Sequence, residues 1–487
     1  MPWTSRIKVN YRIFGLIAGP LVFLLALPFR PDSLEPDAWK VICMAVLMLI
    51  WWISEAVPLA VTALLPVLLL PILGVMSVTH AGAPYASDIV FLFLGGFILA
   101  IGIEKWNLHR RIALNIVRMT GTASNRIILG FMLATAVLSM WISNTATTVM
   151  MLPIATSVVA LLIPEKGYGS KGVERFALVL MLGIAYSANI GGTATLIGTP
   201  PNVVMAGILE TNHGIDIGFL DWMKVGIPFA ALMLFLAYVL LVKVLYPNRV
   251  GRFDGAAEVI HSALMDLGAV SRQEYRVILI FGLTAFLWIF RKLINDLNPL
   301  FELTDSGIAI LSGILLFVVP SGAAKQRPLL NWSDTDRLPW GILLLFGGGL
   351  SLANALNEVG LIAMIGEAFT GIEGMEVVWV VLGLATVSLF MTEVMSNVAL
   401  TSVLIPVVAA IAIGIDSDPI LFAVPVTLAA SCAFMLPMAT PPNAIVFASN
   451  RITVAQMVKA GIFHNLLAIL IIWLFSSYVL PIILGTV

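Results

Sequence analysis

Apolar segments long enough to cross a bilayer follow one another along most of the chain, separated by short polar stretches. A helical membrane span needs about 20 predominantly apolar residues. The pattern predicts eleven transmembrane helices, at residues 11–29, 39–57, 58–76, 87–106, 174–212, 219–246, 273–293, 305–320, 338–357, 419–450 and 455–484. The fold class that it indicates is an all-α polytopic membrane protein.

Two further apolar segments, residues 124–163 and 375–412, are about twice as long as one span. Each has a polar break near its middle, TrpIleSerAsnThrAlaThrThr at 141–148 and ValMetSerAsnValAlaLeuThr at 394–401. We interpret both segments as re-entrant helical hairpins that enter and leave the membrane on the same side. Their tips should line the binding site, because non-helical backbone at this depth needs protein or a wet cavity around it.

The hairpins belong to a longer internal repeat. An offset of 253 residues relates Ser143 to Ser396, Asn144 to Asn397, Pro153 to Pro406, Gly95 to Gly348, Gly96 to Gly349 and Ala100 to Ala353. A further pair of motifs, GlyThrProProAsn at 198–202 and AlaThrProProAsn at 439–443, follows the hairpins at an offset of 241 residues. An odd number of predicted crossings separates the two halves, so they are inserted in opposite directions. Inverted repeats with broken helices at matching points are typical of secondary transporters.

The repeat predicts a division of the chain into four parts. Residues 1–38 form an N-terminal helix and connection, 39–246 the first inverted repeat, 247–272 a cytoplasmic linker and 273–487 the second inverted repeat. Each repeat contains scaffold helices, one hairpin and one broken helix, at 174–212 in the first repeat and 419–450 in the second.

Composition agrees with a membrane protein, since 60% of the residues are hydrophobic and only 11% are charged, against roughly 25% charged residues in soluble domains. The net charge of −1 provides no basic surface for nucleic acid. The basic residues of the loops fall largely on one predicted side: Arg6, Lys8, Arg12, Lys105, Arg110, Arg111, Arg118, Lys166, Lys171, Arg175, Arg249, Arg252, Arg272, Lys325, Arg327, Arg337 and Arg451. The exceptions are Arg30, Arg291 and Lys292.

By the positive-inside rule the basic side faces the cytoplasm. The distribution therefore predicts a multi-pass protein of the cell's inner (plasma) membrane, with the N-terminus in the cytoplasm and the C-terminus outside. The opposite loops are acidic or neutral, as in residues 357–376 with Glu358, Glu373 and Glu376.

Hydroxyl, amide and backbone groups are the candidate chemistry at the four breaks. Helix N-termini attract carboxylates, while hydroxyl, amide and carbonyl oxygens suit a small hard cation such as Na⁺. The prolines of ThrProProAsn lack a backbone donor and bar a continuing helix, which frees carbonyl oxygens. No Lys, Arg or His lies within the four motifs. An anion bound there needs a co-bound cation to offset its charge, which predicts cation coupling.

The two SerAsn tips, the two ProProAsn motifs and the lengths between them resemble the divalent anion/sodium symporter family, the INDY-type sodium–dicarboxylate cotransporters, over nearly the whole chain. The resemblance implies sodium-coupled uptake of C4 dicarboxylates of the succinate, malate and fumarate type. It also implies an elevator movement, a homodimer, two or more sodium ions as co-substrate, no organic cofactor and no enzymatic activity.

The resemblance further implies the residues of the site. Substrate would contact Ser143, Asn144, Thr145, Thr199, Ser396, Asn397, Val398, Thr440 and Pro441. Sodium site one would use Ser139, Ser143, Asn144 and the Gly198 carbonyl, and sodium site two Thr392, Ser396, Asn397 and the Ala439 carbonyl. Val398 stands where the family pattern has threonine, so one hydroxyl is missing and the preferred dianion stays open.

Other functions remain open from the sequence. A sulfate transporter or a sodium-independent dicarboxylate exchanger could use the same fold, and an anion channel is a further alternative because re-entrant hairpins also build selectivity filters. A membrane enzyme of the HisGluXaaXaaHis type is excluded, since this motif is absent. Glu393, three residues before Ser396, has two interpretations, a structural hydrogen-bonding role or proton coupling.

Overall fold

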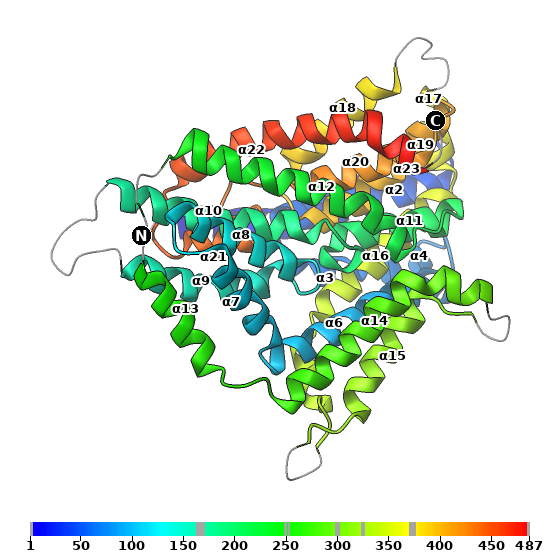
Figure 1. The fold of residues 1–487 in the computed structure, drawn as a ribbon. Coiled ribbons are helices and arrows are strands. Elements are labelled where there is room, and N and C mark those ends of the chain that lie inside the picture. The colour runs from blue at the N-terminus through cyan, green and yellow to red at the C-terminus, as the bar shows by residue number, and fades with distance from the viewer. Residues whose placement is uncertain are drawn as a thin grey trace.

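The structure, a computed structural model, describes residues 3–161, 171–247, 251, 254–297, 302–322, 327–369 and 376–484. Helices are the regular elements of this part of the chain, beside one isolated antiparallel bridge between Pro320 and Pro328. Figure 1 shows long helices lying side by side, with the two ends of the chain at opposite ends of the molecule. The prediction of an all-helical membrane protein is confirmed.

The first half of the chain forms α1 (Trp3–Ala26), α2 (Pro36–Ser54), α3 (Leu59–Thr62), α4 (Leu65–Ile72), α5 (Val78–Gly82), η1 (Ala83–Ala86), α6 (Asp88–Lys105), α7 (Leu108–Thr120), α8 (Ser124–Ser139), α9 (Asn144–Ala160), α10 (Lys171–Gly192), η2 (Leu196–Gly198), α11 (Pro200–His213), α12 (Phe219–Val239) and the π-helical η3 (Leu240–Leu245).

The second half forms α13 (Asp254–Asp266), α14 (Arg272–Leu297), α15 (Asp305–Val318), η4 (Trp332–Arg337), α16 (Trp340–Glu358), α17 (Leu361–Phe369), α18 (Val377–Met391), α19 (Asn397–Gly414), α20 (Pro419–Ala430), α21 (Pro441–Phe447), α22 (Val454–Leu474), the π-helical η5 (Phe475–Val479) and α23 (Leu480–Leu484).

Eight helical segments of the described chain are long and apolar enough to span a membrane: Pro36–Ser54, Val78–Lys105, Lys171–Gly192, Phe219–Leu245, Arg272–Leu297, Trp340–Glu358, Asn397–Gly414 and Val454–Ile483. Shorter apolar helices supply the other predicted spans and hairpin arms, among them α1, α8, α9, α15, α18 and α20. The number of eleven crossings stays a prediction.

The span predicted over residues 58–76 consists of two short helices, because α3 and α4 are separate and α4 ends at Ile72. Three prolines explain the interruptions. Pro58 precedes α3, Pro66 lies in the first turn of α4, and Pro71 lies near its end. Proline lacks the backbone N–H that a continuous helix needs.

Both predicted hairpins form pairs of helices with a non-helical tip, and of the four arms α19 alone is long enough to span a membrane by itself. In the first, α8 ends at Ser139 and α9 begins at Asn144; in the second, α18 ends at Met391 and α19 begins at Asn397. Residues 162, 163 and 375 of the predicted hairpins lie outside the described residues. The arms also pack on the broken helices, α8 and α9 on α10, and α18 and α19 on α20.

The two halves of the chain are interleaved. α11 of the first half packs against α19, and α21 of the second half packs against α9 and α10. α15 lies along α6 (Figure 1). The repeated glycines permit such contacts: a Cβ on Gly95 would clash with the backbone of Ala309, and one on Gly348 with the backbone of Ala63. Each of these two glycines therefore packs on a helix of the other half.

The three exceptions to the predicted charge distribution are held by local partners. Arg291 Nε lies 3.2 Å from Asp305 Oδ1, and Lys292 Nζ lies 2.8 Å from Asp221 Oδ2. Arg30 donates to the Leu34 carbonyl at 2.8 Å. Lys166, Arg249, Arg252, Lys325 and Glu373, which the topology prediction used, lie outside the described residues.

Candidate functional site

The four predicted motifs each lie at the start of a helix. Ser143 precedes α9, Thr199 precedes α11, Ser396 precedes α19 and Thr440 precedes α21. Three of these helices have 14 to 18 residues, whereas α21 has seven. The N-terminal N–H groups of a helix carry partial positive charge and favour anions. The four helix starts therefore carry partial positive charge, although none of the four motifs contains a basic side chain.

The first hairpin tip brings three oxygen atoms together. Ser139 Oγ lies 2.5 Å from Asn144 Oδ1 and 2.8 Å from the Ala188 carbonyl oxygen of α10. The Gly198 carbonyl lies nearby, since a Cβ on Gly192 would lie 2.7 Å from Asn144 Oδ1 and 3.2 Å from Gly198 O. We call Ser139 Oγ, Asn144 Oδ1 and Ala188 O cluster one.

The second hairpin tip repeats this arrangement. Thr392 Oγ1 lies 2.6 Å from Asn397 Oδ1 and 2.7 Å from the Ala430 carbonyl oxygen of α20. We call these three atoms cluster two. The predicted partners Ser139 with Asn144, and Thr392 with Asn397, are thus brought together as pairs.

In each cluster one hydroxyl group faces two acceptor oxygens. A hydroxyl group has one hydrogen to donate, yet the central hydroxyl of each cluster lies within hydrogen-bond distance of two acceptors. Each hydroxyl can therefore donate to only one of its two neighbouring oxygens at a time. A small hard cation would satisfy all three oxygens, which is the chemistry that oxygen ligands offer to Na⁺.

Equivalent asparagines hold the two broken helices open. Asn202 Nδ2 donates to the carbonyls of Gly192 and Thr195 at 3.3 and 2.8 Å. Asn443 Nδ2 donates to the carbonyls of Ala433 and Leu436, both at 3.1 Å. Both asparagines are fully buried. The last residue of each ThrProProAsn motif therefore fixes the carbonyls that the break has released.

Glu393 also holds the second break, through hydrogen bonds to its backbone N–H groups. Its carboxylate accepts from the backbone N–H groups of Phe434, Met435 and Leu436 at 2.8, 2.9 and 3.1 Å. It also accepts from Asn465 Nδ2 at 2.8 Å, and the residue is 3% exposed. These contacts are those of a structural hydrogen-bonding role, the first of the two interpretations from the sequence.

The two tips differ in exposure at their third position. Thr145 is exposed, whereas Val398 is buried, at 8%. Ser143 is exposed and its Oγ accepts from the Ala146 N–H at 3.2 Å. Ser396 is half-buried, without a side-chain bond to the first turn of α19. The two tips therefore differ in the burial of the third residue as well as in its side-chain hydroxyl.

The remaining predicted residues lie at the broken helices. Thr199 and Thr440 are buried, and Thr440 Oγ1 accepts from Asn189 Nδ2 at 3.1 Å. Ala439 is half-buried and Pro441 is exposed. No direct contact between the two tips is among the hydrogen bonds of the described residues, whereas Asn189 of α10 is hydrogen-bonded to the second break.

Sequence reasoning missed the residues that α10 contributes. Ala188 supplies a carbonyl to cluster one, Asn189 contacts the second break, and Gly192 leaves room for the Asn144 side chain. The signal for them is the polar and small stretch SerAlaAsnIleGlyGlyThr at 187–193, which closes an otherwise apolar helix.

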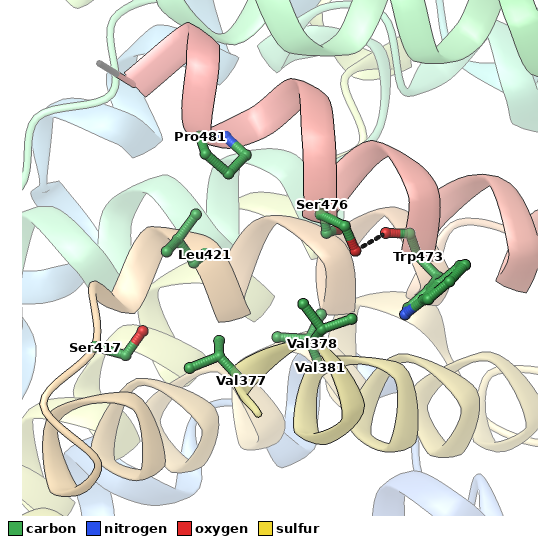
Figure 2. A pocket seen from close by; sticks show the side chains of 9 residues that line it. Val377, Val378, Val381, Ser417, Leu421, Trp473, Ser476 and Pro481 are labelled. Atoms are coloured by element: carbon green, nitrogen blue, oxygen red, sulfur yellow. Dashed lines mark hydrogen bonds between the residues drawn. The ribbon is translucent and has the colours of Figure 1, made fainter. Parts of the chain in front are cut away.

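A pocket of about 210 Å³ lies away from the predicted site (Figure 2). Its walls come from α18, α20 and the C-terminal segment, and they are mainly apolar, with Val377, Val381, Leu421 and Trp473. The pocket contains none of the predicted site residues. Its hydroxyls are used locally, since Ser476 and Ser477 donate to backbone carbonyls of their own helix at 2.7 Å.

Comparison with known proteins identifies similar sequences over nearly the full length. Residues 8–485 match the family described as sodium:sulfate symporter transmembrane region. A Staphylococcus saprophyticus protein named sodium-dependent dicarboxylate transporter SdcS is 40% identical over 479 residues, which cover 97% of this chain and 92% of that protein. A Staphylococcus aureus protein of the same name is similar to the same extent, with 40% identity over 479 residues and the same coverages of 97% and 92%.

Two solved structures share the fold at low sequence identity. The YdaH transporter of Alcanivorax borkumensis has a TM-score of 0.54 and 14% identity, over 99% of each chain. MtrF of Neisseria gonorrhoeae, described within a class of antimetabolite efflux pumps, has a TM-score of 0.55 and 12% identity, over 94% of this chain and 97% of that one. At such identities the likeness extends to the fold alone.

Proposed function

Because the chain belongs to the sodium:sulfate symporter family, also called divalent anion/sodium symporters, we propose that it takes up C4 dicarboxylates together with sodium ions. This is a family of transporters, so the expectation that the chain is no enzyme is confirmed. The observation that carries the proposal is the repeated oxygen cluster, in which one hydroxyl oxygen lies within hydrogen-bond distance of an amide oxygen and a backbone carbonyl oxygen.

In this proposal one sodium ion binds at each tip. Site one uses Ser139, Ser143, Asn144 and the Gly198 carbonyl, and site two uses Thr392, Ser396, Asn397 and the Ala439 carbonyl. The Ala188 and Ala430 carbonyls, each within hydrogen-bond distance of the cluster hydroxyl, are additional candidate ligands. A cation bound to these oxygens would fix both tips.

The dianion would bind at the helix starts beside the ions, in contact with Ser143, Asn144, Thr145, Thr199, Ser396, Asn397, Val398, Thr440 and Pro441. Helix dipoles offset part of its charge, and the sodium ions offset the rest. The same proposal includes alternating access by an elevator movement and a homodimer. It also includes the four-part division of the chain and the cytoplasmic N-terminus. Their support is the inverted repeat and the family.

Sulfate is the second candidate substrate, because the family description names it. The relatives with 40% identity are named for dicarboxylates, which favours succinate. Competition in proteoliposomes decides between them: labelled succinate uptake is measured under a fixed inward sodium gradient with unlabelled succinate or sulfate added. Stronger inhibition by succinate is expected, and stronger inhibition by sulfate would overturn the substrate class.

The site itself is tested by substitution of the two repeated asparagines. Asn144→Ala and Asn397→Ala each remove the amide oxygen of one cluster, so each is expected to abolish sodium-dependent uptake. Elution of both variants as folded protein on size-exclusion chromatography is the control. Normal transport by either variant would remove that asparagine from the site.

A further inference from the structure

Two adjacent residues of α10 contact the two halves of the proposed site. The Ala188 carbonyl accepts from Ser139 Oγ of cluster one at 2.8 Å. Asn189 Nδ2 donates to Thr440 Oγ1 at 3.1 Å and to the Ala433 carbonyl at 3.3 Å, both in the second break. Both α10 residues are fully or almost fully buried. One turn of one helix therefore connects the first hairpin tip with the loop that precedes α21.

Tyr186 strengthens the same connection. Its hydroxyl donates to the Phe434 carbonyl at 2.9 Å, and its ring packs on the Phe434 ring with centroids 5.0 Å apart. Tyr186 and Asn189 thus hold two consecutive carbonyls of the segment that leads to Ala439 and Thr440. A displacement of this turn of α10 would displace that segment.

The equivalent hydrogen bond from α20 to the first break is absent from the described residues, although α20 packs on α11. The clusters relate Ala188 to Ala430, so the position equivalent to Asn189 is Ser431. Ser431 is buried at 2%, and its hydroxyl has no hydrogen-bond partner in the described part of the chain. The link between the two breaks is therefore carried by the first repeat, and Ser431 provides a matched control position.

We propose that Asn189 is a positioning residue that couples the two sodium sites. This inference rests on the proposed function for the identity of the ligand. Sodium at site one fixes α10 through the Ala188 carbonyl, and Asn189 passes this restraint to the Ala439 and Thr440 loop of site two. Coupling of this kind is reciprocal, so sodium at site two also favours sodium at site one.

The test measures succinate uptake and thermal unfolding of the purified protein as functions of sodium concentration. The wild-type protein is expected to show a Hill coefficient for sodium above 1. In Asn189→Ala the coefficient falls toward 1 and the half-saturating sodium concentration rises about fivefold or more, while uptake at saturating sodium is retained. Ser431→Ala is expected to match the wild type.

A second variant guards against misfolding of Asn189→Ala. Tyr186→Phe keeps the ring and removes only the hydroxyl donor, so it should shift the sodium dependence in the same direction by a smaller factor. If Asn189→Ala and Tyr186→Phe both keep the wild-type Hill coefficient, the coupling role is overturned while the transport function stands. A wild-type protein whose uptake ignores sodium would overturn the proposed function as well.

A double-mutant cycle separates coupling from a local effect at site two. Ser139→Ala weakens site one, and its effect on half-saturating sodium is measured with and without Asn189→Ala. If Asn189 couples the sites, the combined effect differs from the product of the single effects by about threefold or more. Multiplicative effects would contradict the proposal.

Discussion

At the scale of single residues, Gly192 determines whether cluster one can form. A Cβ at this position would lie 2.7 Å from Asn144 Oδ1 and 3.2 Å from the Gly198 carbonyl. Gly192→Ala is therefore expected to displace Asn144 and to abolish sodium-dependent uptake. Gly383→Ala, in α18 with no atom within 4 Å of the added Cβ, is the matched control and should transport normally. Full activity of Gly192→Ala would show that the Asn144 position is not required.

Glu393 gives a prediction about stability. Glu393→Ala removes the acceptor of one buried and two half-buried N–H groups and of the buried Asn465, and each buried donor left unsatisfied costs about 1–3 kcal/mol. A clear fall in unfolding temperature is expected. Glu393→Gln keeps part of the acceptor capacity and should lie between that variant and the wild type. Retained sodium-driven uptake in Glu393→Gln, with its usual pH dependence, would support the structural role over proton coupling.

The residues of the tips were predictable, and those of α10 were not. Ser143, Asn144, Ser396 and Asn397 are visible because they are polar groups within apolar sequence and occur twice. The Ala188 carbonyl carries no such signal, because any residue has a carbonyl and its availability depends on the fold.

At the scale of helices, the ThrProProAsn motifs predicted both breaks correctly because proline ends a preceding helix and favours a first turn. The same property of proline accounts for residues 58–76, where Pro58 precedes α3 and Pro66 and Pro71 lie in α4. Hydropathy alone treats these prolines as part of an apolar run, so it overestimates the length of the helix.

Arg111 of α7 forms an ion pair with Glu274 of α14, and it also donates to the carbonyls of Leu267, Gly268 and Ala269. Arg111 Nε and Nη2 contact the two oxygens of Glu274 at 2.7 and 3.1 Å, with side chains 13% and 5% exposed. Arg111→Ala leaves the Glu274 carboxylate buried without its cation, so a loss of about 3–5 kcal/mol in the free energy of unfolding is expected. Thermal unfolding of the purified protein measures it.

The exposed pair Arg12 with Glu55 is the control for that experiment, since both side chains are more than half exposed. Arg12→Ala should change the free energy of unfolding by about 1 kcal/mol or less. Equal effects of the two substitutions would contradict the importance of burial at Arg111.

At the scale of the whole molecule, the sequence predicted the inverted repeat but not the exchange of contacts between its halves. A constant offset shows that two segments correspond, yet it contains no information on which copies touch. The structure places α11 against α19 and α21 against α9, so each broken helix supports the hairpin of the other repeat.

The predicted orientation can be tested with introduced cysteines, because the two native cysteines, Cys43 and Cys432, are free and buried. Met119→Cys lies at the exposed end of α7 on the predicted cytoplasmic side, and Glu376→Cys lies exposed on the opposite side. A membrane-impermeant thiol reagent added to intact cells should label Glu376→Cys alone. Labelling of Met119→Cys alone would invert the topology.

The central claim is that oxygen clusters without a basic partner bind sodium and so make anion uptake depend on it. Its most direct test is labelled succinate uptake into proteoliposomes, with and without an inward sodium gradient at equal ionic strength. We expect succinate to accumulate with the gradient and to be taken up little when potassium replaces sodium. Equal uptake in the two conditions would contradict it.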